Sequence, residues 1–140
     1  MKKEQDFFNE YRLMYRPFIN QINVQLEQYG LYSSQWGLLR LLTEKGPLTF
    51  GDIAIAMYIE KPSVTKLVQK LVELQFVEIK PGKDKREKIV HLTNDGVKKI
   101  DEIHLALQPL LQKALNGVTN EEMVNAEKVL AQIRINITNG

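Results

Sequence analysis

The 140-residue sequence predicts a mainly α-helical protein that carries one small β-hairpin. Apolar residues recur at intervals of three and four through most of the chain, which is the spacing of helices with one buried face. Two short β-favouring runs, 76–79 and 88–92, are separated by a charged segment rich in turn formers. The chain is long enough to build its own hydrophobic core, so we expect 1–140 to form a single domain.

The first two helices are bounded by clear stop and start signals. Apolar residues keep the helical spacing through about 5–29, and Gly30 ends the run. Pro17 lies inside this pattern, so we expect a bend or a broken turn just before it. The pair Ser33-Ser34 is suited to cap a second helix over 35–43.

Two further helices precede the hairpin. After a break at 44–47, Thr49 caps a short helix that has Asp52 at its third position. Pro62 fits the first turn of the next helix, because its fixed φ is helical and its missing N–H has no partner to lose there. One face of that helix is apolar and is formed by Val64, Leu67, Val68 and Leu71.

The segment after the hairpin predicts two more helices. Thr93 caps the first, which contains Pro109, runs to about Leu115 and ends before Gly117. A capping box, Thr119-Asn-Glu-Glu122, begins the second. Along the second helix, apolar residues follow a coiled-coil-like spacing at Met123, Ala126, Leu130, Ile133 and Ile137.

The composition excludes several classes of chemistry. The chain has no cysteine, which rules out disulfides, thiolate metal clusters and a cysteine nucleophile. No apolar run approaches the roughly 18 residues that span a bilayer, and the charged N-terminus is unlike a signal peptide, so we expect a cytoplasmic protein with no membrane partner. His91 and His104 have no convincing partners, and no glycine-rich phosphate loop is present. We therefore expect no enzyme activity, no metal site and no cofactor.

The positive charge is concentrated in one segment. Residues 61–88 contain eight basic and four acidic side chains, a net charge of +4, whereas the rest of the chain carries −2. An anionic partner at this segment is one explanation, and an ordinary lysine-rich surface is the other. Charge alone does not decide between them.

The order of elements around the basic segment favours DNA as the partner. Two short helices, a tight turn and a hairpin with a basic tip form a winged helix-turn-helix, whose second helix fits the major groove. Like charges four residues apart repel, so Lys66 and Lys70 are easier to explain with phosphates opposite them. An arginine at the hairpin tip suits a narrow minor groove. The candidate DNA-binding residues are Lys61, Pro62, Ser63, Thr65, Lys66, Gln69 and Lys70 on the helix and Lys83, Asp84, Lys85, Arg86 and Lys88 on the hairpin.

The hairpin also carries a recognisable motif. Residues 84–96, DKREKIVHLTNDG, match D-x-R-x-x-x-V-x-L-T-x-x-G and resemble the wing signature of the MarR (multiple antibiotic resistance regulator) family. The segment 62–68, PSVTKLV, is similar to the start of that family's recognition helix. The resemblance implies that Asp84 braces the wing by pairing with a basic side chain, beyond acting as a turn former, while Arg86 enters the minor groove. Lys66 replaces the arginine of many relatives and lacks its bidentate fork, which puts guanine readout by this residue in doubt.

The resemblance further implies two lobes and a homodimer. Residues 31–92 would form a winged-helix DNA-binding lobe, and 1–30 with 93–140 a helical dimerisation lobe. Broad apolar stripes on the flanking helices support a dimer independently, because a monomer would leave part of them exposed. The alternative is that these helices pack on their own DNA-binding lobe. A dimer of this kind would bind a palindromic operator, and we expect it to act as a repressor.

Members of this family often bind small aromatic or anionic molecules between the lobes. One arginine among aromatic side chains suits a benzoate-like acid, and aromatic residues at helical spacing are also common in cores. The candidate pocket residues are Tyr11, Tyr15, Arg16, Tyr29, Tyr32 and Trp36. A repressor or architectural DNA-binding protein with no effector is the alternative.

Overall fold

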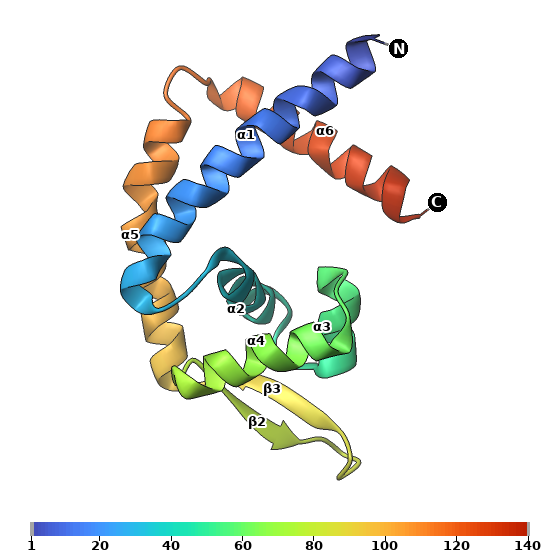
Figure 1. Ribbon diagram of the computed structural model, residues 1–140, viewed down its shortest axis with the longest axis vertical. Helices are drawn as coiled ribbons and strands as arrows, with labels where there is room; N and C mark the ends of the chain where they lie inside the picture. Colours follow the sequence, from blue (N-terminus) through green and yellow to red (C-terminus); the bar gives the residue numbers. More distant parts are fainter. Residues whose placement is uncertain (1, 140) are drawn as a thin grey trace. The chain divides into compact units, whose positions relative to one another are not determined.

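The structure, a computed structural model, describes residues 2–139. Within this range the elements follow the order α1 (Lys2–Leu26), η1 (Glu27–Tyr29), α2 (Ser33–Lys45), β1 (Leu48–Thr49), α3 (Phe50–Met57), α4 (Lys61–Glu73), β2 (Val77–Pro81), β3 (Lys88–Leu92), α5 (Asn94–Ala114) and α6 (Asn120–Thr138) (Figure 1). The mainly α class with a small β wing is confirmed. Each helix expected from the sequence is present, in the expected order.

The chain forms two compact units, Met1–Gln108 and Pro109–Gly140. The first contains α1 to α4, the sheet and most of α5, and the second contains the end of α5 and α6. This boundary lies elsewhere than the lobe limits expected near 30 and 92. Those limits concern DNA binding and dimerisation, and they stay a prediction.

The core of the first unit collects one face of each helix. The almost fully buried side chains are Leu26, Leu31, Leu38, Leu39, Leu42, Ile53, Val64, Val68, Leu71, Phe76, Val77, Val90, Ile100 and Ile103. Full burial of one such side chain stabilises a fold by roughly 1.5–3 kcal/mol. Because α4 turns Val64, Val68 and Leu71 inward, its polar residues are left on the surface, as the sequence predicts.

Two expectations about the first two helices are corrected, one for the middle of α1 and one for the start of α2. The helix α1 runs unbroken through Pro17, so the broken turn is wrong; both Pro17 and Leu13 are exposed, and water can bind the carbonyl that proline leaves without a partner. The cap of α2 is Tyr32 rather than Ser33 or Ser34. The Tyr32 N–H donates to Gln35 Oε1 (2.6 Å), and the Ser33 N–H donates to Asn23 Oδ1 of α1 (2.7 Å). The second bond comes from a distant part of the chain.

The remaining helix starts are capped as predicted. Thr49 Oγ1 accepts from the Asp52 N–H (3.1 Å), and Thr119 with Glu122 forms the reciprocal capping box of α6. Gly30 and Gly117 have left-handed backbones after α1–η1 and α5, as helix-ending glycines do.

Two helices end at left-handed residues that are not glycine. Tyr58 (φ 56°) follows α3, and Gln75 (φ 64°) lies just after α4. In each case the next N–H closes the helix: Ile59 donates to the Ala54 carbonyl (3.1 Å) and Phe76 to the Leu71 carbonyl (2.9 Å). Glycine is usual at such positions, because a side chain there costs roughly 1–2 kcal/mol.

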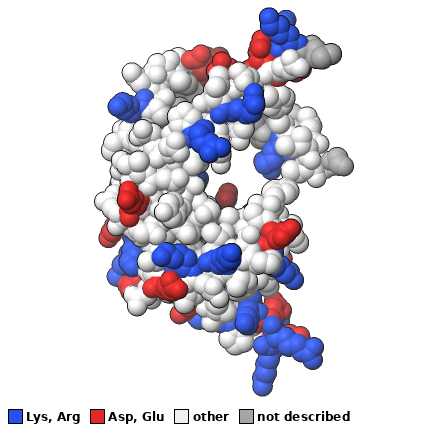
Figure 2. All heavy atoms as spheres, viewed as in Figure 1, with Lys and Arg blue, Asp and Glu red and all other residues white. Residues whose placement is uncertain are grey.

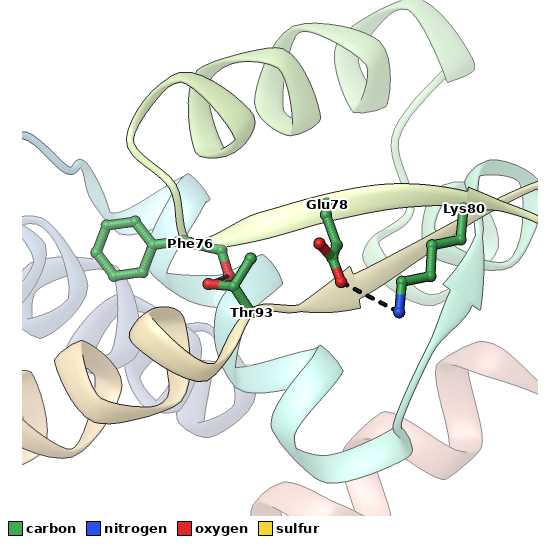
Figure 3. A network of polar contacts seen from close by, with 4 residues as sticks. All are labelled: Phe76, Glu78, Lys80 and Thr93. Carbon is green, nitrogen blue, oxygen red and sulfur yellow. Dashed lines mark hydrogen bonds and ion pairs between the residues drawn. The ribbon is translucent and has the colours of Figure 1, made fainter.

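The sheet has three antiparallel strands in the order β1-β3-β2, and β1 was not expected from the sequence. This two-residue strand pairs Leu48 with Val90 and Thr49 with Ile89, which holds the start of α3 against the hairpin. On the exposed face of β2, Lys80 and Glu78 form an ion pair (3.2 Å; Figure 3).

A hydrogen-bonded clasp joins the end of α4 to the start of α5. The Thr93 N–H donates to the Phe76 carbonyl (3.0 Å), and the Thr93 hydroxyl donates to the Gln75 carbonyl (2.7 Å; Figure 3 shows Thr93 beside Phe76). Thr93 Oγ1 also accepts from the Gly96 N–H, capping α5 (2.8 Å). A Cβ at residue 96 would overlap the Phe76 carbonyl oxygen, so Thr93 and Gly96 of the hairpin motif have a structural reason to occur together.

Candidate nucleic-acid interface

The exposed face of α4 carries polar and basic side chains without an acid. Ser63, Thr65, Lys66, Gln69 and Lys70 are all exposed, and the first acidic residue of the helix is Glu73. The Thr65 hydroxyl donates to the Lys61 carbonyl (3.1 Å), which leaves its oxygen as an acceptor and its methyl group free to meet a base edge. We call α4 the recognition helix. Its exposed groups suit base edges and phosphates.

The hairpin tip is a compact turn that displays cations. The Gly82 N–H donates to the Glu87 carbonyl (2.8 Å), and the Glu87 N–H donates to the Asp84 carbonyl (2.9 Å). The Asp84 carboxylate accepts from the Arg86 N–H (3.1 Å) and therefore acts as a turn former. The ion pair expected for Asp84 is not among those formed within 2–139. We call β2, β3 and the connecting residues 82–87 the wing.

Positive charge gathers where these two parts lie. Lys83, Lys85 and Arg86 are exposed at the wing tip, together with Lys88 at the start of β3. Figure 2 shows lysine and arginine side chains grouped at the projecting hairpin and along α4, with fewer acidic groups between them. A surface of this sign attracts a polyanion and concentrates it near the recognition helix.

A groove lies between the turn end of the wing, at residues 86–88, and the start of the recognition helix. Its volume is about 450 Å³, and it is lined by Thr49, Phe50, Gly51, Lys61, Arg86, Glu87 and Lys88. We call it the wing groove. Three of its side chains are cationic and one, Glu87, is acidic. The groove exists because β1 brings Thr49 against β3, so no spacing in the sequence indicates it.

The six candidate pocket residues are spread over the first unit. Tyr11 and Tyr15 stack on each other at 5.8 Å on the exposed side of α1, beside the exposed Arg16. Trp36 is buried and meets the ring of His104 edge-on at 4.9 Å. Tyr29 is half-buried and Tyr32 is exposed.

Of these six, Tyr32 lines a cavity of about 560 Å³, which we call the Lys70 cavity. The other lining residues are Asn20, Asn23, Val24, Glu27, Gly30, Leu31 and Lys70. The cavity combines apolar walls, two amides, a phenol, the Glu27 carboxylate and the Lys70 ammonium group. One wall comes from the recognition helix itself, through Lys70. No sequence signal marks Asn20 and Asn23 of α1, because they are polar positions outside the apolar pattern of that helix.

Two other kinds of feature are absent from residues 2–139. No group of three or more histidine, cysteine, aspartate or glutamate side chains that could hold a metal ion occurs there. No helix in this part of the chain is long and apolar enough to cross a membrane.

Known proteins share both the sequence and the fold. Residues 31–88 match the MarR family. An uncharacterised HTH-type transcriptional regulator of Bacillus subtilis, YwoH, is 39% identical over 100 residues, which cover 71% of this chain and 73% of YwoH. The structure of Staphylococcus aureus MarR in complex with salicylate and kanamycin is similar with a TM-score of 0.88 and 28% identity, over 99% of this chain and 94% of that one.

A second solved structure is more distant in sequence. A mutant MarR from E. coli complexed with operator DNA superposes with a TM-score of 0.80 at 20% identity, over 91% of this chain and 93% of that one. At this identity the likeness concerns the fold. The related proteins are transcriptional regulators, which supports a regulatory rather than an enzymatic role.

Proposed function

The chain belongs to the MarR family of DNA-binding transcriptional regulators, and on that premise we propose that it is a repressor that binds a palindromic operator as a homodimer. The observation that carries the proposal is the pairing, on one unit, of a cationic wing with a recognition helix that has no acidic residue before Glu73. The order of elements from α3 to β3 is that of a winged helix-turn-helix. We take the cytoplasm, where its DNA target would be, as its location.

The recognition helix and the wing would contact different parts of the DNA. Lys66 and Lys70 on the helix are suited to phosphates, whereas Ser63, Thr65 and Gln69 are suited to base edges. The wing tip would place Arg86 in a neighbouring minor groove. Between these parts the wing groove would seat one backbone phosphate between Lys61 and Lys88. Glu87 on its rim would fix which side of the groove the phosphate takes, because like charges repel.

A second copy of the chain is the proposed partner of the flanking helices. Leu130 and Ile137 of the predicted α6 seam are exposed in the single chain (55% and 75%), and Met123 and Ile133 are only half-buried. An apolar row of this length is unfavourable in water. Burying it against a twofold-related copy would also double the phosphate contacts and explain a palindromic site.

We propose the Lys70 cavity as the effector site. A small aromatic acid would place its carboxylate at the Lys70 ammonium and its ring against Val24 and Leu31. Because Lys70 is also a proposed phosphate contact, acid and DNA would compete for it, and binding of the acid would release the operator. Of the six candidate pocket residues expected from the sequence, Tyr32 alone lines this cavity.

The test begins with a duplex enriched by the unmodified protein from a randomised DNA library. Its affinity and that of a scrambled duplex are measured at several salt concentrations for the unmodified protein, Lys66→Ala and Gln69→Ala. Lys66→Ala should weaken both duplexes and flatten the plot of log affinity against log salt by roughly 0.9. Gln69→Ala should weaken the selected duplex more than the scrambled one and keep the salt slope.

The effector part has its own measurement on the same duplex. Salicylate should release the DNA from the unmodified protein, and Tyr32→Ala should reduce that release while DNA affinity without salicylate stays the same. Absence of any release by salicylate or related aromatic acids would favour a repressor without an effector. Equal affinity for the selected and scrambled duplexes would contradict the proposal that the protein is a sequence-specific repressor.

A further inference from the structure

The turn between the two helices of the helix-turn-helix contains a residue with an unusual combination of properties. Tyr58 has a left-handed backbone (φ 56°) and a side chain that is 77% exposed. Within 2–139 its hydroxyl has no hydrogen-bond partner. A bulky aromatic residue is disfavoured in this conformation, and here neither burial nor a hydrogen bond of the side chain within 2–139 compensates for it. The fold itself therefore gives no reason for a tyrosine at position 58.

Gln75 shows what the same backbone geometry looks like when the fold does explain it. It occupies the equivalent position after α4, with φ 64°. Its carbonyl accepts the Thr93 hydroxyl (2.7 Å), so the clasp holds that backbone in place, and its polar side chain faces solvent at no cost. The two residues share a conformation and differ in what surrounds them.

The position of Tyr58 relates it to the DNA-contacting surface. The first residues of α3 line the wing groove, and Tyr58 follows the other end of this eight-residue helix, about 12 Å along its axis. In Figure 1, α3 leads away from the hairpin toward this end, with the start of α4 nearby. Tyr58 lies three residues before Lys61, the first residue of the recognition helix. The start of that helix is therefore flanked by the wing on one side and by Tyr58 on the other.

We propose that Tyr58 is a DNA-backbone contact, whose phenol O–H donates to a phosphate oxygen at the edge of the major groove opposite the wing. The inference rests on the proposed DNA-binding function. In a helix-turn-helix the first helix crosses the backbone, and tyrosine is one of the side chains that bind phosphate oxygens without carrying charge. The Tyr58 side chain is exposed, so its hydroxyl can be reached from outside the protein. Ile55, one helical turn earlier and also 77% exposed, would lie against the same sugar-phosphate strand.

The experiment uses the full-length protein and the library-selected duplex, with three variants. Tyr58→Phe removes only the hydroxyl and should weaken binding roughly tenfold, as loss of a hydrogen bond to a charged group does, with the salt slope unchanged. Tyr58→Gly removes the whole side chain, so it should weaken binding at least as much as Tyr58→Phe. Because glycine also relieves the backbone strain, Tm should rise by about 2 °C. Gln75→Gly is the matched control: the same strain is relieved, and DNA affinity should stay that of the unmodified protein.

A phosphate-by-phosphate measurement locates the contact. Single neutral methylphosphonates are introduced along the selected duplex, and one of them should weaken the unmodified protein but cause little further loss in Tyr58→Phe. If Tyr58→Phe and Tyr58→Gly bind like the unmodified protein, or no methylphosphonate loses its effect in Tyr58→Phe, Tyr58 is only the residue that ends α3. In that case Lys66→Ala still weakens binding and the proposed function stands. If the library yields no preferred duplex, both proposals fail together.

Discussion

The clasp between the recognition helix and α5 predicts a large effect for a single methyl group. In Gly96→Ala the added Cβ would overlap the Phe76 carbonyl oxygen and lie 2.9 Å from its carbonyl carbon. Both are backbone atoms next to β2, so no flexible side chain can move aside. Either the start of α5 or the start of β2 must shift.

The size of the effect follows from the hydrogen bonds at stake. The shift would disturb Thr93 N–H to the Phe76 carbonyl (3.0 Å), the Thr93 hydroxyl to the Gln75 carbonyl (2.7 Å) and Gly96 N–H to the Thr93 hydroxyl (2.8 Å). At about 1 kcal/mol for each bond, the free energy of unfolding should fall by about 3 kcal/mol. A domain is typically stable by about 5–15 kcal/mol, so this is a substantial fraction.

Urea denaturation at one fixed protein concentration measures the change. Gly96→Ala should lower the midpoint by about 1–2 M. The control is Gly37→Ala, since Gly37 is within α2 and a Cβ there would meet the Met57 methyl at an ordinary 3.8 Å; this change should be neutral or stabilise by up to about 1 kcal/mol. A midpoint for Gly96→Ala equal to that of Gly37→Ala would refute the clasp as a rigid contact.

Three further changes test other parts of the account. Arg86→Ala should weaken binding to the selected duplex by about 1–3 kcal/mol in a gel-shift titration at fixed salt, and should leave the urea midpoint unchanged. Unchanged affinity would show that Arg86 is not part of the interface. The unmodified protein should sediment at twice the 16.2 kDa of one chain, and Ile133→Glu should shift it toward the monomer, because a carboxylate would be buried without a partner. Hydrogen bonds from the Thr119 backbone and hydroxyl hold the pKa of Glu122 below its usual 4.5, so its stabilisation of α6 is present above about pH 4.5 and lost as the pH falls through the lowered value. In Glu122→Gln, the loss of helicity that protonation of Glu122 causes should be absent from an acid titration followed by circular dichroism. If the variant and the unmodified protein gave the same titration curve, the result would count against the capping box.

Much of the fold could be predicted because its signals are local. Capping by Thr49 and Thr119 depends on groups within three residues, and the inward face of α4 follows from helical spacing. Strand β1 and the start of α2 could not be predicted because each depends on contacts between distant segments. Two residues are too few for strand β1 to leave a pattern, and the α2 start depends on Asn23 of α1. The broken turn near Pro17 was wrong because an exposed helix accommodates the missing bond.

In the candidate site, too, features that depend on local spacing could be predicted, and features that depend on contacts between elements could not. Exposure of Ser63, Thr65, Lys66, Gln69 and Lys70 follows from the helix pattern, and the structure confirms that exposure. The two cavities could not be foreseen, because each is made by residues brought together from different elements. The backbone of a single residue, such as Tyr58, is not a property that spacing encodes.

Hydroxyl-radical footprinting of the selected duplex tests most directly whether the chain reads DNA through the recognition helix and the wing of a twofold dimer. We expect two protected half-sites related by twofold symmetry, with centres about 10 base pairs or a multiple of that apart. Arg86→Ala should remove the flanking minor-groove protection from both half-sites and leave the central protection in place. A single continuous footprint without twofold symmetry, or one that Arg86→Ala leaves whole, would contradict this expectation.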